Sequence, residues 1–194
     1  MQNLSDEELM LNYQRGEALA MDEILKRYKN PVYGFALRLL ANSAEAEDIA
    51  QEVFMRLHKF RDNYRPSGKF RSWVFSIAHN LCVSSLRKRK WLVIWPRNKE
   101  NPDELMDFQS PDPSPDEQAS NNEVSNAVKT CIQELPFLQK EALILREYQN
   151  LDYDEIGKIL HRPLGTVKTL IYRARQNLKE KLLPYLEVKE GLNE

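Results

Sequence analysis

The sequence predicts an all-α protein with two helical domains, residues 1–91 and 123–194, joined by an extended acidic, proline-rich linker over residues 92–122. Apolar residues recur at helical spacing along most of the chain, and no strand pattern of comparable length appears. Only 6 of the 194 residues are glycine, which disfavours a turn-rich β fold. Prolines 96, 102, 111, 113 and 115 interrupt the linker, where fixed φ angles disfavour a packed element. The linker composition fits a disordered tether as well as a binding segment.

Composition favours a soluble cytoplasmic protein. No apolar run approaches the roughly 20 residues of a membrane span, and the acidic start MQNLSDEELM lacks the order of a signal peptide. Cys82 and Cys131 are far apart and have no C-x-x-C partner, which disfavours a disulfide or a zinc site. We expect no metal and no cofactor.

Four helical stretches are expected in the N-terminal domain. Asn30-Pro31 predicts a helix restart, because asparagine caps helices and proline suits the first turn. Asn42-Ser43 predicts the start of the third helix, and Pro66-Ser67-Gly68 precedes a fourth helix over Phe70–Lys90. The expected inward residues are Leu9, Met10, Tyr13, Ile24, Leu25, Tyr28, Val32, Phe35, Ala36, Leu39, Leu40, Ile49, Val53, Leu57, Phe60, Val74, Ile77, Leu81 and Leu86.

In the C-terminal domain, one helix is expected from Val124 to Leu135 and a second from about Leu138 to Tyr148. Two short amphipathic helices joined by a tight turn follow within Leu151–Leu182. Residues 156–179 hold six Lys or Arg and no Asp or Glu, and residues 61–90 hold eight basic side chains and one acidic. Two cationic segments in a chain of net charge -1 indicate a polyanion partner.

The last two helices predict a DNA-reading helix-turn-helix. A helical wheel places Val167, Leu170, Ile171, Ala174 and Leu178 inward, against the preceding helix with Ile156, Ile159 and Leu160. The N-terminal part of the outward face would enter the major groove, and backbone N–H groups near Gly165 could hold a phosphate. A solvated basic helix of a bundle would explain the amphipathicity, but not the absence of acidic residues. The expected DNA contacts are Arg162, Pro163, Gly165, Thr166, Lys168, Thr169, Tyr172, Arg173 and Gln176.

Three segments together resemble the extracytoplasmic-function sigma factors of bacterial RNA polymerase, in the sigma-70 family. The segment LPFLQKEALILREYQNLDYDEIGKIL and the following HRPLGTVKTLIYRARQNLKEKL resemble region 4 of that family. The segment AEAEDIAQEVFMRLHKF resembles region 2.2, and KFRSWVFSIAHNLCVSSLRKRK resembles regions 2.3 and 2.4. The motifs occur in the family's order, and the resemblance covers the chain from Leu4 to about Leu186.

The resemblance implies a subunit that binds core RNA polymerase and directs promoter-specific transcription initiation. Its implied partners are the clamp coiled coil of the largest subunit, the flap of the second-largest subunit, promoter DNA, and an anti-sigma factor that could hold it at the inner membrane. No small-molecule substrate is implied. The helix-turn-helix would read the minus-thirty-five element, and the acidic linker would thread toward the polymerase active-site and RNA-exit region.

The resemblance also implies site residues in the N-terminal domain. Phe54, beside carboxylates, suits a protein interface, with a core position as the alternative. The implied core-polymerase contacts are Asp48, Gln51, Glu52, Phe54 and Leu57.

The cationic helix of Phe70–Lys90 would open and read the minus-ten element. Its aromatic residues Phe70, Trp73 and Phe75 could stack on bases, worth about 1–3 kcal/mol per base where exposed, although Trp73 fits the core equally well. Ser84 stands where the family commonly has Asp, and His79, expected on the helix surface, stands where Arg or Thr is frequent. The implied minus-ten contacts are Arg71, Trp73, Asn80, Ser84, Arg87, Lys88, Arg89 and Lys90.

Two other functions fit the sequence less well. A stand-alone regulator of duplex DNA explains the C-terminal half but gives no purpose to AEDIAQEVF. A nucleic-acid enzyme is disfavoured, because no carboxylate cluster or His/Cys set has metal-site spacing and no Ser/His/Asp arrangement is evident.

Overall fold

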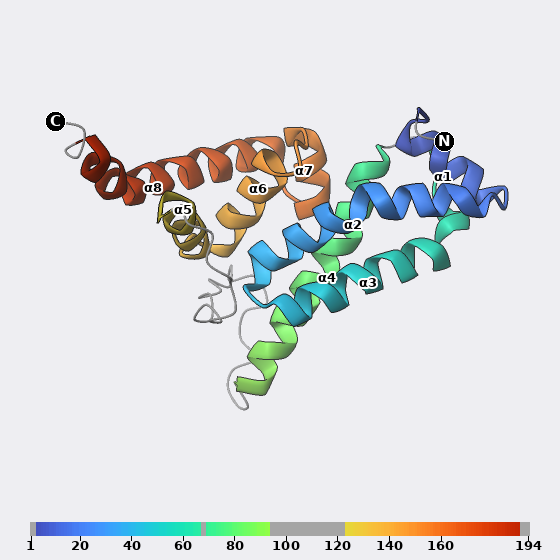
Figure 1. The fold of residues 1–194 in the computed structure, drawn as a ribbon, viewed down its shortest axis with the longest axis horizontal. Helices are drawn as coiled ribbons and strands as arrows, with labels where there is room; N and C mark the ends of the chain where they lie inside the picture. Colours follow the sequence, from blue (N-terminus) through green and yellow to red (C-terminus); the bar gives the residue numbers. More distant parts are fainter. Residues whose placement is uncertain (1–2, 67–68, 94–122, 191–194) are drawn as a thin grey trace.

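A computed structural model describes residues 3–66, 69–93 and 123–190, with the backbone alone for 90–93, 123–125 and 186–190. Within these ranges the chain is all-α, as predicted (Figure 1). Most of the predicted linker lies outside the described residues. The helices are α1 (Asp6–Gln14), α2 (Ala18–Leu40), α3 (Ser43–Lys59), η1 (Arg61–Asn63), α4 (Phe70–Val93), α5 (Glu123–Gln133), α6 (Phe137–Glu147), α7 (Tyr153–Leu160) and α8 (Leu164–Glu190).

Helix α2 runs unbroken through Pro31, so the restart predicted at Asn30-Pro31 is wrong. A proline inside a helix removes one backbone hydrogen bond and strains the preceding turn. The apolar stripe nevertheless stays in phase across it, because Ile24, Tyr28, Val32 and Phe35 are all buried on one side. Packing of this continuous face against α3 and α4 keeps the helix whole.

Helix α3 begins where the sequence predicts. The side chain of Asn42 accepts a hydrogen bond from the Glu45 N–H at 2.9 Å and caps the helix. Ile49, Val53 and Leu57 are buried, as expected, but Phe60 is 41% exposed. The prediction for Phe60 is wrong because α3 ends at Lys59, and the chain turns into η1 before the stripe reaches that side chain.

Helix α4 crosses the N-terminal half and supplies much of its core. Val74 and Leu86 are buried, whereas Ile77 and Leu81 are half-buried. Phe75 meets Phe35 edge-on, with ring centroids 5.5 Å apart. Helix α1 fixes the start of α4, since Glu7 Oε1 accepts a hydrogen bond from the Phe70 N–H at 2.9 Å.

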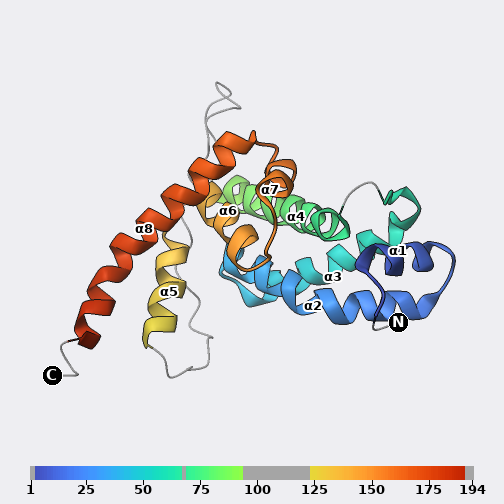
Figure 2. The ribbon, with the colours of Figure 1, turned by 90° about the horizontal axis from the view of Figure 1, so that it is seen from above.

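In the C-terminal half, α7 and α8 form the predicted helix-turn-helix. The second helix is not short: α8 has 27 residues and continues through Pro184. It is long because α5 and α6 both pack along it, and Figure 2 shows α5 beside the distal part of α8.

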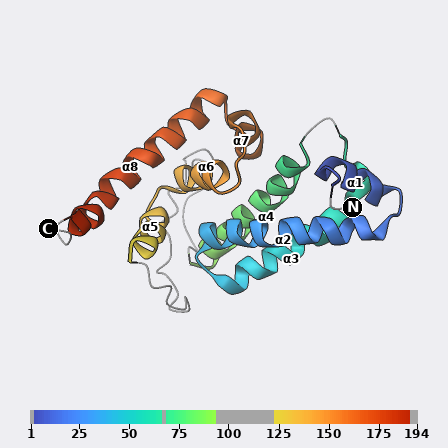
Figure 3. The same ribbon diagram turned by 45° about the horizontal axis from the view of Figure 1, so that its top comes forward.

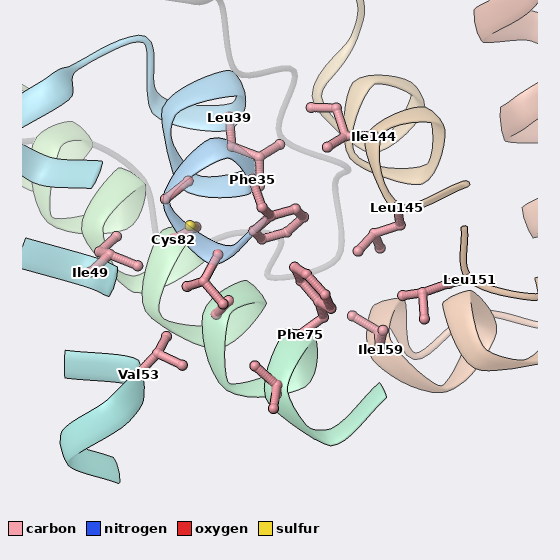
Figure 4. Packing of buried hydrophobic residues seen from close by; sticks show 14 of the residues in the cluster. Phe35, Leu39, Ile49, Val53, Phe75, Cys82, Ile144, Leu145, Leu151 and Ile159 are labelled. Atoms are coloured by element: carbon pink, nitrogen blue, oxygen red, sulfur yellow. The ribbon is translucent and has the colours of Figure 1, made fainter. Parts of the chain in front are cut away.

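The two halves pack against each other. Helix α4 contacts α7, and α2 contacts α5 and α6, whereas α3 lies on the side away from α7 and α8 (Figure 3). Phe35 and Phe75 point toward Leu145, Leu151 and Ile159 (Figure 4), and all five belong to one continuous apolar cluster. The sequence predicts the two units but not this contact between them.

Candidate nucleic-acid interface

The predicted recognition face of α8 is open to solvent. Val167, Ile171 and Ala174 are buried, and Leu170 and Leu178 are half-buried, so the helix faces α7 as the wheel predicts. The side chains of the outward set are all exposed: Arg162, Pro163, Gly165, Thr166, Lys168, Thr169, Tyr172, Arg173 and Gln176.

The turn between α7 and α8 holds this face in place. His161 adopts a left-handed conformation with φ 53°, and the Arg162 N–H donates to the Gly157 carbonyl at 2.9 Å. A Cβ on Gly157 would lie 2.8 Å from the Arg162 carbonyl oxygen, closer than real Cβ contacts allow. Glycine at 157 is therefore what lets the turn close.

Cations on α8 serve two purposes. Arg175 reaches back to α6, where its Nη2 and Nε atoms lie 2.5 and 3.1 Å from Glu147 Oε1. This pairing raises the pKa of Arg175 and anchors the helix. Arg162, Lys168 and Arg173 form no ion pair with a described residue. These three side chains can neutralise phosphates.

Helix α4 presents a second polar stripe. Asn80, Ser84, Arg87 and Lys88 are exposed, and Arg71 is half-buried. The Ser84 hydroxyl donates to the Asn80 carbonyl at 2.7 Å, so its hydrogen bond stays within the helix. The side chain of Lys90, also predicted to contact DNA, lies outside the described residues.

Arg89 is held by the protein itself. Its Nε lies 2.7 Å from Glu45 Oε1 and its Nη2 lies 2.6 Å from Glu45 Oε2, a two-point pairing with the first turn of α3. This pairing fixes α4 on α3. The guanidinium of Arg89, which the sequence predicts to contact DNA, is therefore already bound to a carboxylate of the protein.

The aromatic residues of α4 correct the stacking prediction. Phe70 and Phe75 are fully buried, so neither can stack on a base. Trp73 is half-buried, with its ring 5.2 Å from the Tyr64 ring and 6.0 Å from the Phe70 ring. Burial of Tyr64 raises the pKa of its phenol to about 12. Of these three aromatic residues, only Trp73 is partly exposed to solvent.

His79 is not a surface residue as predicted. Its side chain is 11% exposed, and its Nδ1 lies 2.5 Å from Oε1 of Glu141, which is fully buried on α6. The prediction is wrong because the C-terminal half covers this side of α4. The apolar periodicity of α4 by itself does not show that another part of the chain packs over this side of the helix.

Two more residues at the start of α4 meet carboxylates of α7. Lys69 Nζ lies 2.7 Å from Asp152 Oδ2 and 3.4 Å from Glu155 Oε2. The Ser72 hydroxyl donates to Glu155 Oε1 at 2.6 Å, and the Asp152 N–H donates to Glu155 Oε2 at 2.8 Å. The hydrogen bond from Lys69 lowers the pKa of Asp152, and the same bond raises the pKa of Lys69.

The outward face of α3 differs from the predicted polymerase set at two positions. Asp48 and Gln51 are exposed and Glu52 is half-buried, but Phe54 is only 8% exposed and Leu57 is fully buried. Both belong to the core because the inward stripe of α3 is wide enough to include position 54 beside Val53. The exposed apolar residue is the neighbouring Met55, at 59%.

Met55 is not among the predicted polymerase contacts, although the sequence places it on the same helix face as three of them. Asp48, Gln51, Glu52 and Met55 follow the spacing i, i+3, i+4, i+7 of one helix face. Extending the predicted polar stripe by one turn would have selected Met55 in place of Phe54.

Within the described ranges, no set of three or more His, Cys, Asp or Glu residues is placed to hold a metal ion. None of the described helices is long and apolar enough to cross a membrane.

Comparison with known families identifies both halves. Residues 24–92 match Sigma-70 region 2 and residues 125–178 match Sigma-70 region 4. The chain is 31% identical over 189 residues to the RNA polymerase sigma-H factor of Pseudomonas aeruginosa, covering 93% of this chain and 95% of that protein. It is 33% identical over 171 residues to the ECF RNA polymerase sigma factor SigW of Bacillus subtilis, covering 87% and 91%.

Solved structures share the fold. The sigma factor RpoE of Bartonella quintana, in complex with the anti-sigma factor NepR, superposes with a TM-score of 0.64 at 23% identity, covering 83% of this chain and 95% of that one. CnrH, in complex with the cytosolic domain of CnrY, gives 0.64 at 17% identity, covering 91% and 96%. Matches to sigma factors across both halves leave the stand-alone regulator without support. The chain belongs to the extracytoplasmic-function sigma factors of the sigma-70 family, the subunits that bind core RNA polymerase and direct promoter-specific transcription initiation.

Proposed function

We propose that this sigma factor divides its work among three surfaces: α8 reads the minus-thirty-five element, α4 opens and reads the minus-ten element, and α3 docks on core polymerase. The observation that carries the division is the exposure of three separate polar faces on these helices. Residues 1–91 and 123–194 are the corresponding functional domains, with residues 92–122 as their linker.

The minus-thirty-five role of α8 is supported by its charge and its exposure. Thr166, Lys168 and Thr169 lie at the start of a helix whose N-terminal end favours anions, and Arg173 lies one turn further along. Recognition helices place such residues in the major groove, where arginine can pair with guanine. We assign base contacts to Thr169 and Arg173 and phosphate contacts to Arg162 and Lys168.

The minus-ten role of α4 is supported by the stripe of Asn80, Ser84, Arg87 and Lys88, which is open to solvent. The amide of Asn80 can bond to base edges, and Arg87 and Lys88 can neutralise phosphates. Arg89 contributes chiefly by fixing α4 to α3 through Glu45.

The polymerase role of α3 is supported by the stripe of Asp48, Gln51, Glu52 and Met55. An exposed methionine flanked by acidic and amide side chains suits a protein interface better than a free surface. Helix α3 also lies on the side away from α7 and α8 (Figure 3), and Asp48, Gln51 and Met55 are exposed while the two halves are in contact.

Two pairs of substitutions test this division of labour. Thr169→Ala with Arg173→Ala should lower promoter-specific transcription while core-polymerase binding persists. Glu52→Ala with Met55→Ala should weaken core-polymerase binding while a minus-thirty-five duplex is still bound. Equal loss of polymerase binding in both double variants would contradict the assignment, and circular dichroism would check that each variant folds.

The protein acts as a specificity subunit with no chemistry of its own, and an anti-sigma factor controls it in the cytoplasm, holding it at the inner membrane. The structurally similar sigma factor RpoE is bound to the anti-sigma factor NepR, and the similar protein CnrH is bound to the cytosolic domain of CnrY, which supports such a partner here. Affinity purification from membrane and soluble fractions would test the idea, and recovery of core polymerase alone from both fractions would contradict it.

A further inference from the structure

The C-terminal half of α4 has an outward and an inward face, and both carry polar side chains. The outward face is the solvent-exposed stripe of Asn80, Ser84, Arg87 and Lys88. The inward face follows the spacing i, i+3, i+4, i+7 and consists of Cys82, Ser85, Leu86 and Arg89. On this inward face Cys82 and Leu86 are buried, whereas Ser85 and Arg89 are half-buried. Because the two faces lie on opposite sides of one helix, a rotation of α4 about its axis would turn the outward stripe away from the DNA strand that it would contact.

Arg89 connects α4 to the ends of two other helices. Its Nε and Nη2 atoms lie 2.7 and 2.6 Å from the two carboxylate oxygens of Glu45, in the first turn of α3. Its Nη1 donates to the carbonyl of Leu40, the last residue of α2, at 3.4 Å. The C-terminal end of a helix favours a cation and the first turn favours a carboxylate. One guanidinium therefore meets both preferences and ties the corner between α2 and α3 to the basic end of α4.

Glu45 holds α4 at a second point. Its Oε2 accepts a hydrogen bond from the Ser85 hydroxyl, one turn before Arg89, at 3.2 Å. A two-point pairing of arginine with a carboxylate fixes direction as well as distance. The side chains of Arg89 and Glu45 are only 28% and 31% exposed, so water and salt screen the pair incompletely. The rotation of α4 at its basic end therefore depends on this one carboxylate of α3.

A DNA phosphate offers Arg89 no better partner than Glu45. Transfer of the guanidinium to a phosphate would exchange one two-point pairing for another. It would also break the bond to the Leu40 carbonyl and leave the Glu45 carboxylate unpaired beside a polyanion. Arg87 and Lys88 are exposed and form no ion pair with a described residue, so they can reach phosphates without such a loss. Arg89 is thus better suited to hold α4 in place than to contact DNA.

We propose that Glu45 and Arg89 are a positioning pair, which sets the rotation of α4 so that its outward stripe meets the minus-ten strand, and that Arg89 itself does not contact DNA. Ser85 supports the pair through the same carboxylate. This inference rests on the proposed minus-ten role of α4. It gives Arg89, one of the predicted minus-ten contacts, a role that acts through its neighbours Arg87 and Lys88.

Strand opening by the full chain with core polymerase tests the pair. Glu45→Gln removes the charge of the carboxylate, and Arg89→Lys keeps a positive charge but loses the two-point geometry. Each should lower the permanganate reactivity of unpaired minus-ten thymines by about tenfold, because each breaks hydrogen bonds between charged groups. The double variant should lose no more than the weaker single variant, since both substitutions break the same interaction. Binding to core polymerase and to a minus-thirty-five duplex should not change.

Two results of this experiment would overturn the proposal. Normal strand opening by Arg89→Lys would do so, because a lysine can still contact a phosphate but cannot hold Glu45 in the same way. Independent losses that multiply in the double variant would also do so, because they would show that the two residues act separately.

The salt dependence of DNA binding separates positioning from competition. If Glu45 only kept Arg89 away from DNA, Glu45→Gln would tighten binding of the holoenzyme to a single-stranded minus-ten oligonucleotide. It would also steepen the slope of log affinity against log salt by about 0.7, as one more phosphate is neutralised. The positioning role predicts weaker binding and no steeper slope. Tighter binding with a steeper slope would therefore overturn it.

A matched control is Glu47→Gln, which removes the same charge two residues further along α3. Glu47 is exposed and forms no ion pair with a described residue, so strand opening should not change. A loss equal to that of Glu45→Gln would show that the charge of α3, rather than the pair, is responsible.

A further variant, Arg87→Ala with Lys88→Ala, tests the proposed function separately. Normal strand opening by this variant would overturn the minus-ten role of α4. Loss of strand opening here, together with normal strand opening by Arg89→Lys, would overturn the positioning pair alone.

Discussion

At the scale of single residues, the adjacent Phe54 and Met55 differ in burial and in the role proposed for each. Phe54→Ala should lower the free energy of unfolding by about 3–5 kcal/mol, because it empties a core position. Met55→Ala should change it by less than about 0.5 kcal/mol, since that side chain is 59% exposed, while weakening binding to core polymerase. Urea denaturation and polymerase titration of both variants would check this, and similar unfolding midpoints would contradict the assigned burial.

Lys140 provides a prediction about pH. It is buried, its Nζ donates to the Gln133 carbonyl at 3.0 Å, and desolvation lowers its pKa to about 8. Between pH 8 and about 10.4 the unfolded chain binds the proton more tightly than the folded chain, so stability rises with pH there.

Lys140→Met removes this titration. The free energy of unfolding of the wild type, minus that of Lys140→Met, should therefore increase by about 2 kcal/mol from pH 8 to pH 10. Chemical denaturation of both proteins at the two pH values measures this, and tyrosine and cysteine titrations common to both cancel. Parallel profiles would show that Lys140 is not the group responsible.

At the scale of elements, alanine substitutions at Gly157 and Gly165 distinguish the steric requirement of the turn from the helix propensity of the residue. Gly157→Ala would bring Cβ to 2.8 Å from the Arg162 carbonyl oxygen, so the turn must shift and the melting temperature should fall by several degrees. Gly165→Ala meets nothing within 4 Å, and alanine favours the helix, so its melting temperature should hold or rise. Equal effects at both positions would rule out the close approach at 157.

Helical periodicity predicted the parts that depend on one helix at a time. The inward stripe of α8 and the cap at Asn42 follow from local spacing and from side-chain chemistry, and both occur as expected. Pro31 escaped prediction because tertiary packing outweighs a local helix-breaking preference. His79 escaped because its partner, Glu141, is 62 residues away, and a wheel shows which face is polar but not what covers it.

At the scale of the whole molecule, the two halves share one apolar cluster while carrying the two proposed DNA-binding elements. Apolar burial favours contact between the two halves, and the cost of burying Glu141 opposes it. The halves can be in contact or apart. Polymerase and promoter DNA can each shift this equilibrium only to the extent that they bind one of the two arrangements more tightly than the other. The buried pair of His79 and Glu141 is therefore where substitutions should move this equilibrium most.

His79→Ala removes the described hydrogen-bond partner of the buried Glu141 side chain, and leaving a buried polar group unpaired costs about 1–3 kcal/mol. Rehydration of Glu141 when the halves are apart should shift the chain toward that arrangement. Replacing both residues, His79→Leu with Glu141→Leu, removes both polar groups and should leave the two halves in contact at least as much as in the wild type. Energy transfer between dyes at positions 47 and 179 would report the separation of the halves: the single variant should lengthen the mean distance, and the double variant should not. If the mean distance lengthens equally in both variants, contact between the halves depends on the imidazole of His79, and the buried Glu141 side chain does not determine the equilibrium.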